Sequence, residues 1–364
     1  MTINTFKERP NWPSEDLEHL GRCPICGNSS RNLLYKNLID RLFSAPGRWK
    51  LYQCSSCGTG YLDPRPNKET IGLAYKDYST HTSAEKKLTN DSLLSRLRNG
   101  YLNKKYNYKL PHGNPLGFFL LYLLPPPWRL EWDYYARHLS NPKPGKDKLL
   151  DAGCGNGEFL LRARSQGWIA EGIDIDPEAV KYAANAGLKV KCGDIKSEQF
   201  APSSFDVVTT HQVIEHVHDP HAFLSALYAW LKPGGQLWLG TPNIKSKLRH
   251  DFGEDWYPLQ PPTHLFIFSP ESLIKSLELA GFQEIKFLSR GYIETHYHRI
   301  SSAMRLAGVN FNINLIDSNK KNTMKLHESI YMELLSWMKK QCSSELVITA
   351  CKPKNNNHQK FKNK

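Results

Sequence analysis

A glycine-rich turn between two apolar segments is the part of this sequence best suited to chemistry. Residues 148–176 read KLLDAGCGNGEFLLRARSQGWIAEGIDID, a strand-like segment followed by Gly153, Gly155 and Gly157, a short helix and a second strand. Glycine has no Cβ and tolerates positive φ, so bare backbone in this turn can approach a ligand, and the next helix directs its free N–H groups to the same place. The second strand ends at Asp174, about twenty residues on, where a carboxylate can accept both hydroxyls of a ribose. These residues predict a binding site for a nucleotide-type cofactor.

The spacing of the glycines separates two kinds of cofactor. Dinucleotide folds use G-x-G-x-x-G, whose third glycine lets helix and strand pack beside a pyrophosphate, and Glu158 occupies that position here. A pyrophosphate beside Glu158 would meet a like charge. The pattern D-x-G-x-G-x-G, which begins at Asp151, instead resembles motif I of the class I S-adenosylmethionine-dependent methyltransferases. In that family the loop lies against the methionine part of the ligand, which has an ammonium group and a sulfonium but no phosphate.

Later segments extend the resemblance over residues 148–352. A strand that ends at Gly193 and Asp194 resembles the family's segment for the adenine amino group, and LKPGGQLWLGTPN at 231–243 resembles its fifth strand and the preceding turn. The resemblance implies an α/β fold, a Rossmann-like sheet of seven strands, whose last strand, within 344–352, runs against the others. It also implies these cofactor-binding residues: Asp151, Gly153, Cys154, Gly155, Gly157, Asp174, Ile175, Asp194, Ile195 and His211.

Two loops expected at the carboxyl ends of the strands contain histidines, and ligands of open parallel sheets collect at that edge. Histidine titrates near neutrality, so it suits removal of a proton from a methyl acceptor. We expect His264 to be the general base and His216 to be the next candidate. Glu215 precedes His216, and this pair resembles a family motif that orients the loop around the cofactor. A structural histidine bonded to backbone is the alternative, and we expect no catalytic metal here.

Four cysteines near the N-terminus predict a structural zinc site. Cys23 and Cys26 form one C-x-x-C-G knuckle, and Cys54 and Cys57 form a second. Each knuckle lets two thiolates reach one ion at about 2.3 Å, and four sulfurs leave no open coordination position. Redox activity of one pair is the rival interpretation, although thioredoxin-type motifs occur singly and near a βαβ unit.

The order of these motifs predicts a chain of several parts. We expect a zinc-ribbon module at 1–75, a helical connector at 76–145, the methyltransferase domain at 146–353 and a disordered basic tail at 354–364. A ribbon ahead of such a domain resembles a family of bacterial enzymes that act on sugars and surface polysaccharides. In that family the module helps to cover the substrate, so we expect Tyr61 and Tyr75 to face the cleft. The connector forms either a lid or a plain helical hairpin.

Composition limits the compartment and the partners. The chain has 364 residues, of which 40% are hydrophobic, and a formal net charge of +13. The N-terminal residues are polar, and the longest apolar run, 115–124, is shorter than the ~20 residues that span a bilayer. Eight cysteines without a secretion signal indicate reduced thiols in the cytoplasm. The basic residues before the apolar run form a solvated surface by default, and contact with an anionic membrane face is the functional alternative. The knuckle region lacks the basic, aromatic stripe typical of nucleic-acid binding.

The predicted activity is methyl transfer from S-adenosylmethionine to a small or glycan-linked acceptor, with a sugar hydroxyl of surface polysaccharide biosynthesis as the first hypothesis. Transfer to carbon or nitrogen of a nucleotide sugar or another small metabolite is the alternative. Two further hypotheses are an NAD-dependent oxidoreductase, which Glu158 disfavours, and a ribbon-guided RNA methyltransferase. Trp256 and Tyr257 suit either sugar stacking or core packing. The stretch 291–326 is an insertion relative to the minimal family pattern.

Overall fold

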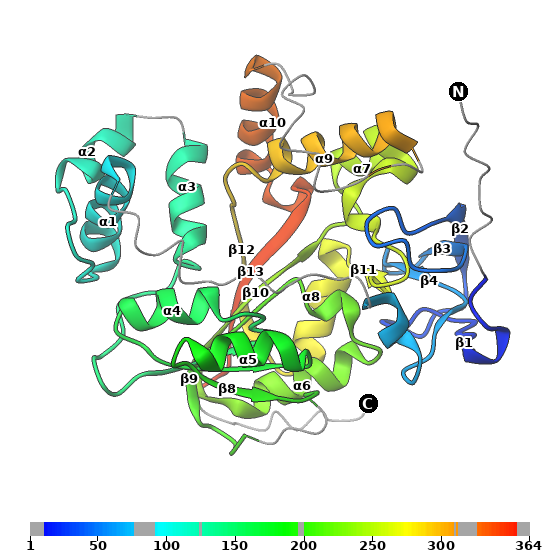
Figure 1. Ribbon diagram of the computed structural model, residues 1–364, viewed down its shortest axis with the longest axis horizontal. Helices are drawn as coiled ribbons and strands as arrows, with labels where there is room; N and C mark the ends of the chain where they lie inside the picture. Colours follow the sequence, from blue (N-terminus) through cyan, green and yellow to red (C-terminus); the bar gives the residue numbers. More distant parts are fainter. Residues whose placement is uncertain are drawn as a thin grey trace, which may run out of the picture.

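The computed structural model describes residues 11–75, 92–123, 126–195, 200–308, 311 and 326–354 (Figure 1). Most of the predicted basic tail therefore lies outside the described residues, as do 312–325 of the predicted insertion.

A seven-stranded mixed sheet forms the centre of the chain, in the order β12-β13-β10-β9-β6-β7-β8. Its strands are β6 (Lys148–Ala152), β7 (Ile169–Asp174), β8 (Lys189–Cys192), β9 (Phe205–His211), β10 (Leu231–Pro242), β12 (Gln283–Leu288) and β13 (Glu345–Cys351). Strands β10, β9, β6, β7 and β8 are parallel neighbours. Strand β13 is antiparallel to both β10 and β12. The predicted fold and the reversed last strand are confirmed.

Short polar caps begin the helices between these strands. Asp176 accepts hydrogen bonds from two backbone N–H groups at the start of α5, and Pro177 fills its first position. Asp219 caps α6 in the same way, and Ser269 forms a capping box at α8. The helices are α4 (Glu158–Ser165), α5 (Pro177–Asn185), α6 (Pro220–Trp230), α7 (Lys247–Phe252), α8 (Pro270–Leu279), α9 (Ile293–Ala307) and α10 (Leu326–Met338). Figure 1 shows α7, α9 and α10 gathered above the sheet.

The N-terminal part forms two small sheets. Strands β1 (Leu17–Glu18) and β5 (Arg65–Pro66) pair with each other. The second sheet has the order β11-β4-β3-β2. Its strands are β2 (Arg31–Leu38), β3 (Trp49–Cys54), β4 (Gly60–Leu62) and β11 (Phe266–Ile267). Because β11 comes from the later part of the chain, this sheet is continuous with the loops of the large domain.

Three helices form an arm at the opposite side of the molecule (Figure 1): α1 (Leu93–Tyr106), α2 (Leu116–Leu123) and α3 (Pro126–Tyr135). The arm has a small core of its own, with Tyr101 and Leu102 fully buried. Tyr101 donates a hydrogen bond to Asp133 on α3 at 2.8 Å, and Lys105 pairs with the same carboxylate at 2.6 Å. These bonds fix α1 against α3, whose end turns toward the large sheet.

Single-turn 3₁₀ helices connect several elements. They are Ser14–Asp16, Ile71–Tyr75, Ile214–His216, Gly253–Asp255, Tyr257–Leu259 and Lys340–Cys342. Tyr61 and Trp256, which the sequence left as candidates for the cleft, are both fully buried in hydrophobic clusters. The expectation that Tyr61 faces the cleft is therefore wrong, since it is fully buried on β4, opposite Phe266 of the neighbouring strand β11, and Trp256 belongs to the core.

Candidate active site

The glycine turn joins β6 to α4 and lies at the carboxyl end of the sheet. Gly153 has a φ of 79°, and a Cβ there would lie 2.2 Å from Cγ2 of Val213. Gly155 has a φ of 51°, and a Cβ on it would meet nothing within 4 Å. A larger residue at position 153 would clash with Val213, so this position requires glycine. At Gly155 the space in front of the backbone is open.

Asp174 ends β7 beside this turn. One carboxylate oxygen accepts the N–H of Gly155 at 2.7 Å, and the other accepts the N–H of Asp176 at 2.9 Å. Burial raises the pKa of this carboxyl group. Each oxygen keeps a further lone pair for an incoming hydroxyl. Asp174 therefore lies beside the glycine turn with room for a further hydrogen bond at each oxygen, next to Ile175, which is 72% exposed.

Asp151, predicted among the cofactor-binding residues, lies behind the turn. Its carboxylate is 1% exposed, accepts a hydrogen bond from Thr209 at 2.8 Å and pairs with the guanidinium of Arg137. Arg137 in turn lies over the ring of Phe159, 3.5 Å from its centroid. The side chain of Asp151 is therefore satisfied within the protein, and it fixes the end of β6 to β9 and to the residues after the arm.

The other predicted cofactor residues are spread around the same edge. Gly157 starts α4 with a φ of 81°, and Cys154 is buried against Gly172 on β7. Asp194 is exposed after β8, and Ile195 beside it is half-buried.

His216, Tyr75 and His264 come together after β9. Nδ1 of His216 lies 2.9 Å from the carbonyl of Thr263 and 3.0 Å from the hydroxyl of Tyr75. The rings of His216 and His264 meet edge to face, with centroids 4.6 Å apart. Burial lowers the pKa of His216 to about 4, so its ring is neutral at physiological pH. The backbone N–H of His216 donates to the carbonyl of Val213 at 2.9 Å. Since Val213 packs against Gly153, the two histidines and Tyr75 lie near the glycine turn.

His264 is more enclosed than expected of a general base. Its side chain is 2% exposed, and Nδ1 lies 2.7 Å from the carbonyl of Pro258. Burial, with His216 nearby, holds its pKa well below the usual value.

Glu215 is fully buried beneath these rings. Oε2 accepts a hydrogen bond from Thr241 at 3.0 Å, whereas Oε1 has no partner among the described residues. Burial raises the pKa of Glu215 to about 8. One ligand atom each of Glu215, His216 and His264 lie within 4.8 Å of one another, but both rings already contact carbonyl groups through Nδ1.

A second polar group surrounds His211 at the end of β9. Nε2 of His211 lies 2.8 Å from Oε1 of Glu345 and 2.5 Å from the hydroxyl of Tyr134. Arg290 pairs with the other oxygen of Glu345. Burial alone would raise the pKa of Glu345, but Arg290 and His211 outweigh it and lower the pKa to about 2.

The ring of His211 is strongly desolvated, which lowers its pKa, yet its side chain remains 30% exposed. The ring is therefore largely enclosed by protein but still partly accessible. Sequence reasoning proposed His211 but missed its partners Tyr134, Arg290 and Glu345. The available signal was one acid at the start of the otherwise apolar strand β13 and one arginine just after β12.

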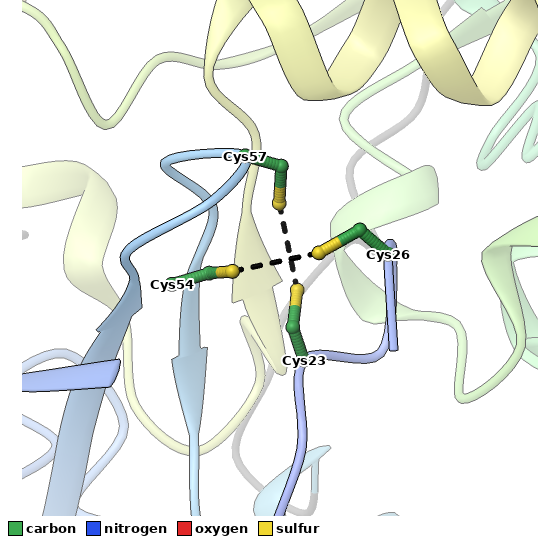
Figure 2. A group of neighbouring side chains, drawn as sticks. All are labelled: Cys23, Cys26, Cys54 and Cys57. Carbon is green, nitrogen blue, oxygen red and sulfur yellow. Dashed lines mark hydrogen bonds between the residues drawn. The ribbon is translucent and has the colours of Figure 1, made fainter. Parts of the chain in front are cut away.

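The four N-terminal cysteines converge (Figure 2). The sulfurs of Cys23 and Cys57 lie 3.6 Å apart, and those of Cys26 and Cys54 lie 3.5 Å apart. Tetrahedral zinc with bonds of about 2.3 Å requires sulfur separations of about 3.8 Å, so the cluster fits a Cys₄ zinc site. Ser269, the cap of α8, donates a hydrogen bond to the carbonyl of Cys57 at 2.6 Å. The cluster is therefore joined directly to the large domain.

Comparison with known proteins agrees with this geometry. A family model described as a methyltransferase domain matches residues 129–286. The ubiquinone biosynthesis O-methyltransferase of Aliivibrio fischeri (strain MJ11) is 31% identical over 214 residues, covering 52% of this chain and 88% of that protein. The enzyme of the same name from Paraburkholderia phymatum is 33% identical over 165 residues, covering 43% of this chain and 68% of that protein.

A solved structure of phosphoethanolamine N-methyltransferase 2 from Haemonchus contortus with S-adenosyl-L-methionine is 16% identical. It covers 81% of this chain and 63% of its own, with a TM-score of 0.43. Three findings lead to one conclusion: the match to the family model, the share of the two relatives that this chain covers, and the strand order. This chain belongs to the class I S-adenosylmethionine-dependent methyltransferases, and S-adenosylmethionine is its methyl donor.

Proposed function

We propose that this enzyme transfers a methyl group from S-adenosylmethionine to a hydroxyl group of a small acceptor, and that the acceptor is a sugar, free or linked to a glycan of surface polysaccharide biosynthesis. The observation that carries the proposal is the hydrogen bond of Tyr75 to His216, beside the turn at Gly153. It joins the neutral imidazole of His216 to the phenol of Tyr75, which comes from the N-terminal part, at the edge where we expect the cofactor. The relatives from Aliivibrio and Paraburkholderia are named as O-methyltransferases, which supports oxygen as the target atom.

The proposed base is His216, with His264 behind it. This reverses the order expected from the sequence, because the ring of His264 is almost completely enclosed while that of His216 is only half-buried. The acceptor oxygen attacks the methyl carbon in line, the carbon–sulfur bond breaks, and S-adenosylhomocysteine leaves. The acceptor proton passes to Nε2 of His216. Positive charge then moves from the sulfonium to the imidazole, so the cleft holds the same net charge throughout.

Glu215 lies close to the proposed base, with a ligand atom within 4.8 Å of one on His216. Its raised pKa keeps it protonated near neutrality, so it adds no negative charge beneath the two rings. Binding in this geometry also holds the acceptor, the methyl carbon and sulfur in line, which by itself lowers the barrier by several kcal/mol in comparable reactions.

A sugar acceptor is proposed from the polarity of the group around His211. Tyr134, His211, Arg290 and Glu345 form one hydrogen-bonded group there. Glu131 on α3 adds a carboxyl group whose pKa burial raises to about 7 and whose Oε2 lacks a partner among the described residues. The Oε2 of Glu131 can accept a hydrogen bond from a hydroxyl of a polyhydroxylated molecule, whereas an aromatic acceptor would leave this oxygen unsatisfied.

Mass spectrometry tests the acceptor class. The protein is incubated with S-adenosylmethionine and a panel of nucleotide sugars, phenols, amines and short RNA. We expect methylation of a nucleotide sugar, with hydrolysis of the product showing a methyl ether. A methyl group on carbon or nitrogen of the sugar would select the alternative chemistry, and modification only of phenol or RNA would reject the sugar proposal.

We propose that Cys23, Cys26, Cys54 and Cys57 hold a structural Zn²⁺, and that the chain divides at the boundaries expected from the sequence, with the zinc-ribbon module ending at 75. The sulfur separations and the buried setting of the cluster support the metal. Elemental analysis should give one zinc per chain, and Cys54→Ser should lower this content and the melting temperature together. An unchanged melting temperature in the presence of a strong chelator would contradict the proposal.

We also propose that the enzyme works in the cytoplasm and contacts the inner membrane face, where lipid-linked glycans are assembled. Within the described residues, no helix has the length and apolar character needed to cross a bilayer. Such contact would therefore be peripheral. Cell fractionation tests it: recovery in the periplasm, or in the cytosol without any membrane-associated fraction at low salt, would count against it.

A further inference from the structure

Helix α2 carries apolar side chains on the face where a surface helix normally carries polar ones. Four of them follow the spacing i, i+3, i+4, i+7 of a single helix face. They are Leu116, Phe119, Leu120 and Leu123, with exposures of 59%, 64%, 46% and 83%. Tyr122 beside this stripe is 52% exposed. We call these five residues the α2 stripe.

The inner face of α2 is tightly packed, so the stripe does not result from a loose helix. A Cβ on Gly117 would lie 2.0 Å from the carbonyl oxygen of Leu97, which shows how closely α2 approaches α1. Leu121 is 3% exposed, and Phe118 stacks on Tyr101 with centroids 6.3 Å apart. Helix α2 is therefore a fixed outer element of the arm (Figure 1).

The segment that carries the stripe is basic. The described residues 92–123 contain Arg96, Arg98, Lys104, Lys105 and Lys109 but no aspartate or glutamate. Lys104 and Lys109 are exposed, and the carbonyl of Arg96 accepts the N–H of Asn114 at 2.8 Å, close to the start of α2. The guanidinium of Arg129 lies 5.0 Å from the centroid of the Tyr122 ring. An apolar stripe on a basic segment, with Arg129 beside Tyr122, complements a surface that is anionic outside and hydrocarbon inside.

We propose that the α2 stripe is the surface by which this protein docks on an anionic lipid bilayer. An eight-residue helix is about 12 Å long, too short to span the membrane but long enough to lie between headgroups and acyl chains. The stripe offers no hydrogen-bonding group except the hydroxyl of Tyr122, which suits hydrocarbon better than the mixed surface of a protein partner. The inference assigns a surface to the membrane contact proposed above, and it does not depend on the reaction or on the identity of the acceptor.

Vesicle flotation tests the apolar part of this surface. The full chain is mixed at low salt with phosphatidylcholine vesicles, with or without phosphatidylglycerol. We expect the wild type to float with the anionic vesicles, and the double variant Phe119→Glu, Leu123→Glu to bind at least about tenfold more weakly. The matched control is Leu279→Glu, Leu306→Glu, which changes leucines that are 65% and 70% exposed on α8 and α9. This control should float like the wild type.

A second pair of variants tests the charges. Lys104→Gln with Lys109→Gln should weaken binding to anionic vesicles by about fivefold for each lysine at low salt. Lys143→Gln with Lys146→Gln, at two exposed positions after the arm, should leave binding unchanged. Calorimetric titration of each variant with S-adenosylhomocysteine should give wild-type affinity, which separates loss of lipid binding from loss of the fold or of the enzyme.

Three results would overturn the proposal. The wild type could remain unbound to anionic vesicles at low salt, or the α2 variants could float as well as the wild type. Light scattering could instead show a wild-type dimer that the α2 variant converts to a monomer, without flotation of either protein. That outcome would assign the stripe to a second copy of the chain.

Discussion

The candidate active site has two groups of residues that are built in different ways. On the predicted cofactor side, one continuous βαβ unit, residues 148–174, supplies the glycine turn and Asp174, and the turn presents its backbone. On the proposed acceptor side, side chains come from segments far apart in the chain: Tyr75, Tyr134, His211, His216, Arg290 and Glu345.

This difference has a chemical reason. The methyl donor is the same molecule in every turnover, so a short backbone loop with one acid is sufficient to hold it. An acceptor is recognised by hydrogen-bond groups placed in a particular pattern, and side chains from several elements are needed to produce that pattern. The donor can therefore be identified from one motif, while the acceptor depends on how distant segments meet.

Replacing the proposed base should have the largest effect. His216→Gln keeps the side-chain volume but removes the proton acceptor, so turnover should fall about a thousandfold. Affinity for S-adenosylhomocysteine should be unchanged, because the cofactor side does not use this ring. Turnover is measured by mass spectrometry, and affinity by calorimetry. His218→Gln, which changes a ring bonded to the carbonyl of Pro66, is the matched control.

The same experiment with His264→Gln decides between the two histidines. We expect a lower melting temperature and a smaller loss of turnover, since this ring is enclosed and bonded to Pro258. If His264→Gln abolishes turnover in a folded protein and His216→Gln does not, the order expected from the sequence is restored.

Asp174→Ala should break the cofactor side alone. Two hydroxyl bonds to a charged acceptor together account for about a hundredfold in affinity, so the Kd of S-adenosylhomocysteine should rise by that factor. Turnover at saturating S-adenosylmethionine should change much less. Glu178→Gln, four positions later and exposed, controls for the loss of a negative charge. If turnover at saturating S-adenosylmethionine fell by the same factor as the affinity for S-adenosylhomocysteine, the two sides would not be separable.

Local signals account for what the sequence predicted correctly. The glycine turn, the caps at Asp176, Asp219 and Ser269, and the strand periods each lie within a few residues, so the elements and their order could be predicted. The four cysteines were also predictable as one cluster, because paired knuckles have a fixed spacing.

The contacts that could not be predicted from the sequence join residues that lie far apart in the chain. The bond of Tyr134 to Glu345 joins residues 211 positions apart, and strand β11 consists of two residues that pair with β4. Neither has a periodic pattern. The sequence also could not show that Arg137 pairs with Asp151, the acid that begins the glycine motif. Because of this pairing, the Asp151 carboxylate lies behind the turn.

Tyr75→Phe sharpens the comparison, because it removes one hydroxyl at the junction of the N-terminal part and the proposed acceptor side. One hydrogen bond to His216 is lost, so turnover should fall about tenfold while cofactor affinity stays constant. Tyr35→Phe is the control, since its hydroxyl contacts Arg249 away from the histidines. The pH dependence of turnover should also shift for Tyr75→Phe, because Tyr75 contacts the ring nitrogen of the proposed base. An unchanged profile would indicate that Tyr75 only packs there.

The smallest effect should come from Glu215→Gln, and it concerns stability. The pKa of Glu215 is raised to about 8 by burial, above the value near 4.5 of an exposed glutamate. Between these values the folded state binds the extra proton, so this residue makes the wild type less stable as pH rises from about 4.5 to 8. Glutamine imitates the protonated form at every pH. The variant should therefore match the wild type near pH 5 and be more stable by at least about 1 kcal/mol at pH 8, measured by urea unfolding. A variant that is less stable at both pH values would mean that the carboxylate form is required, for example to bind a cation with His216 and His264.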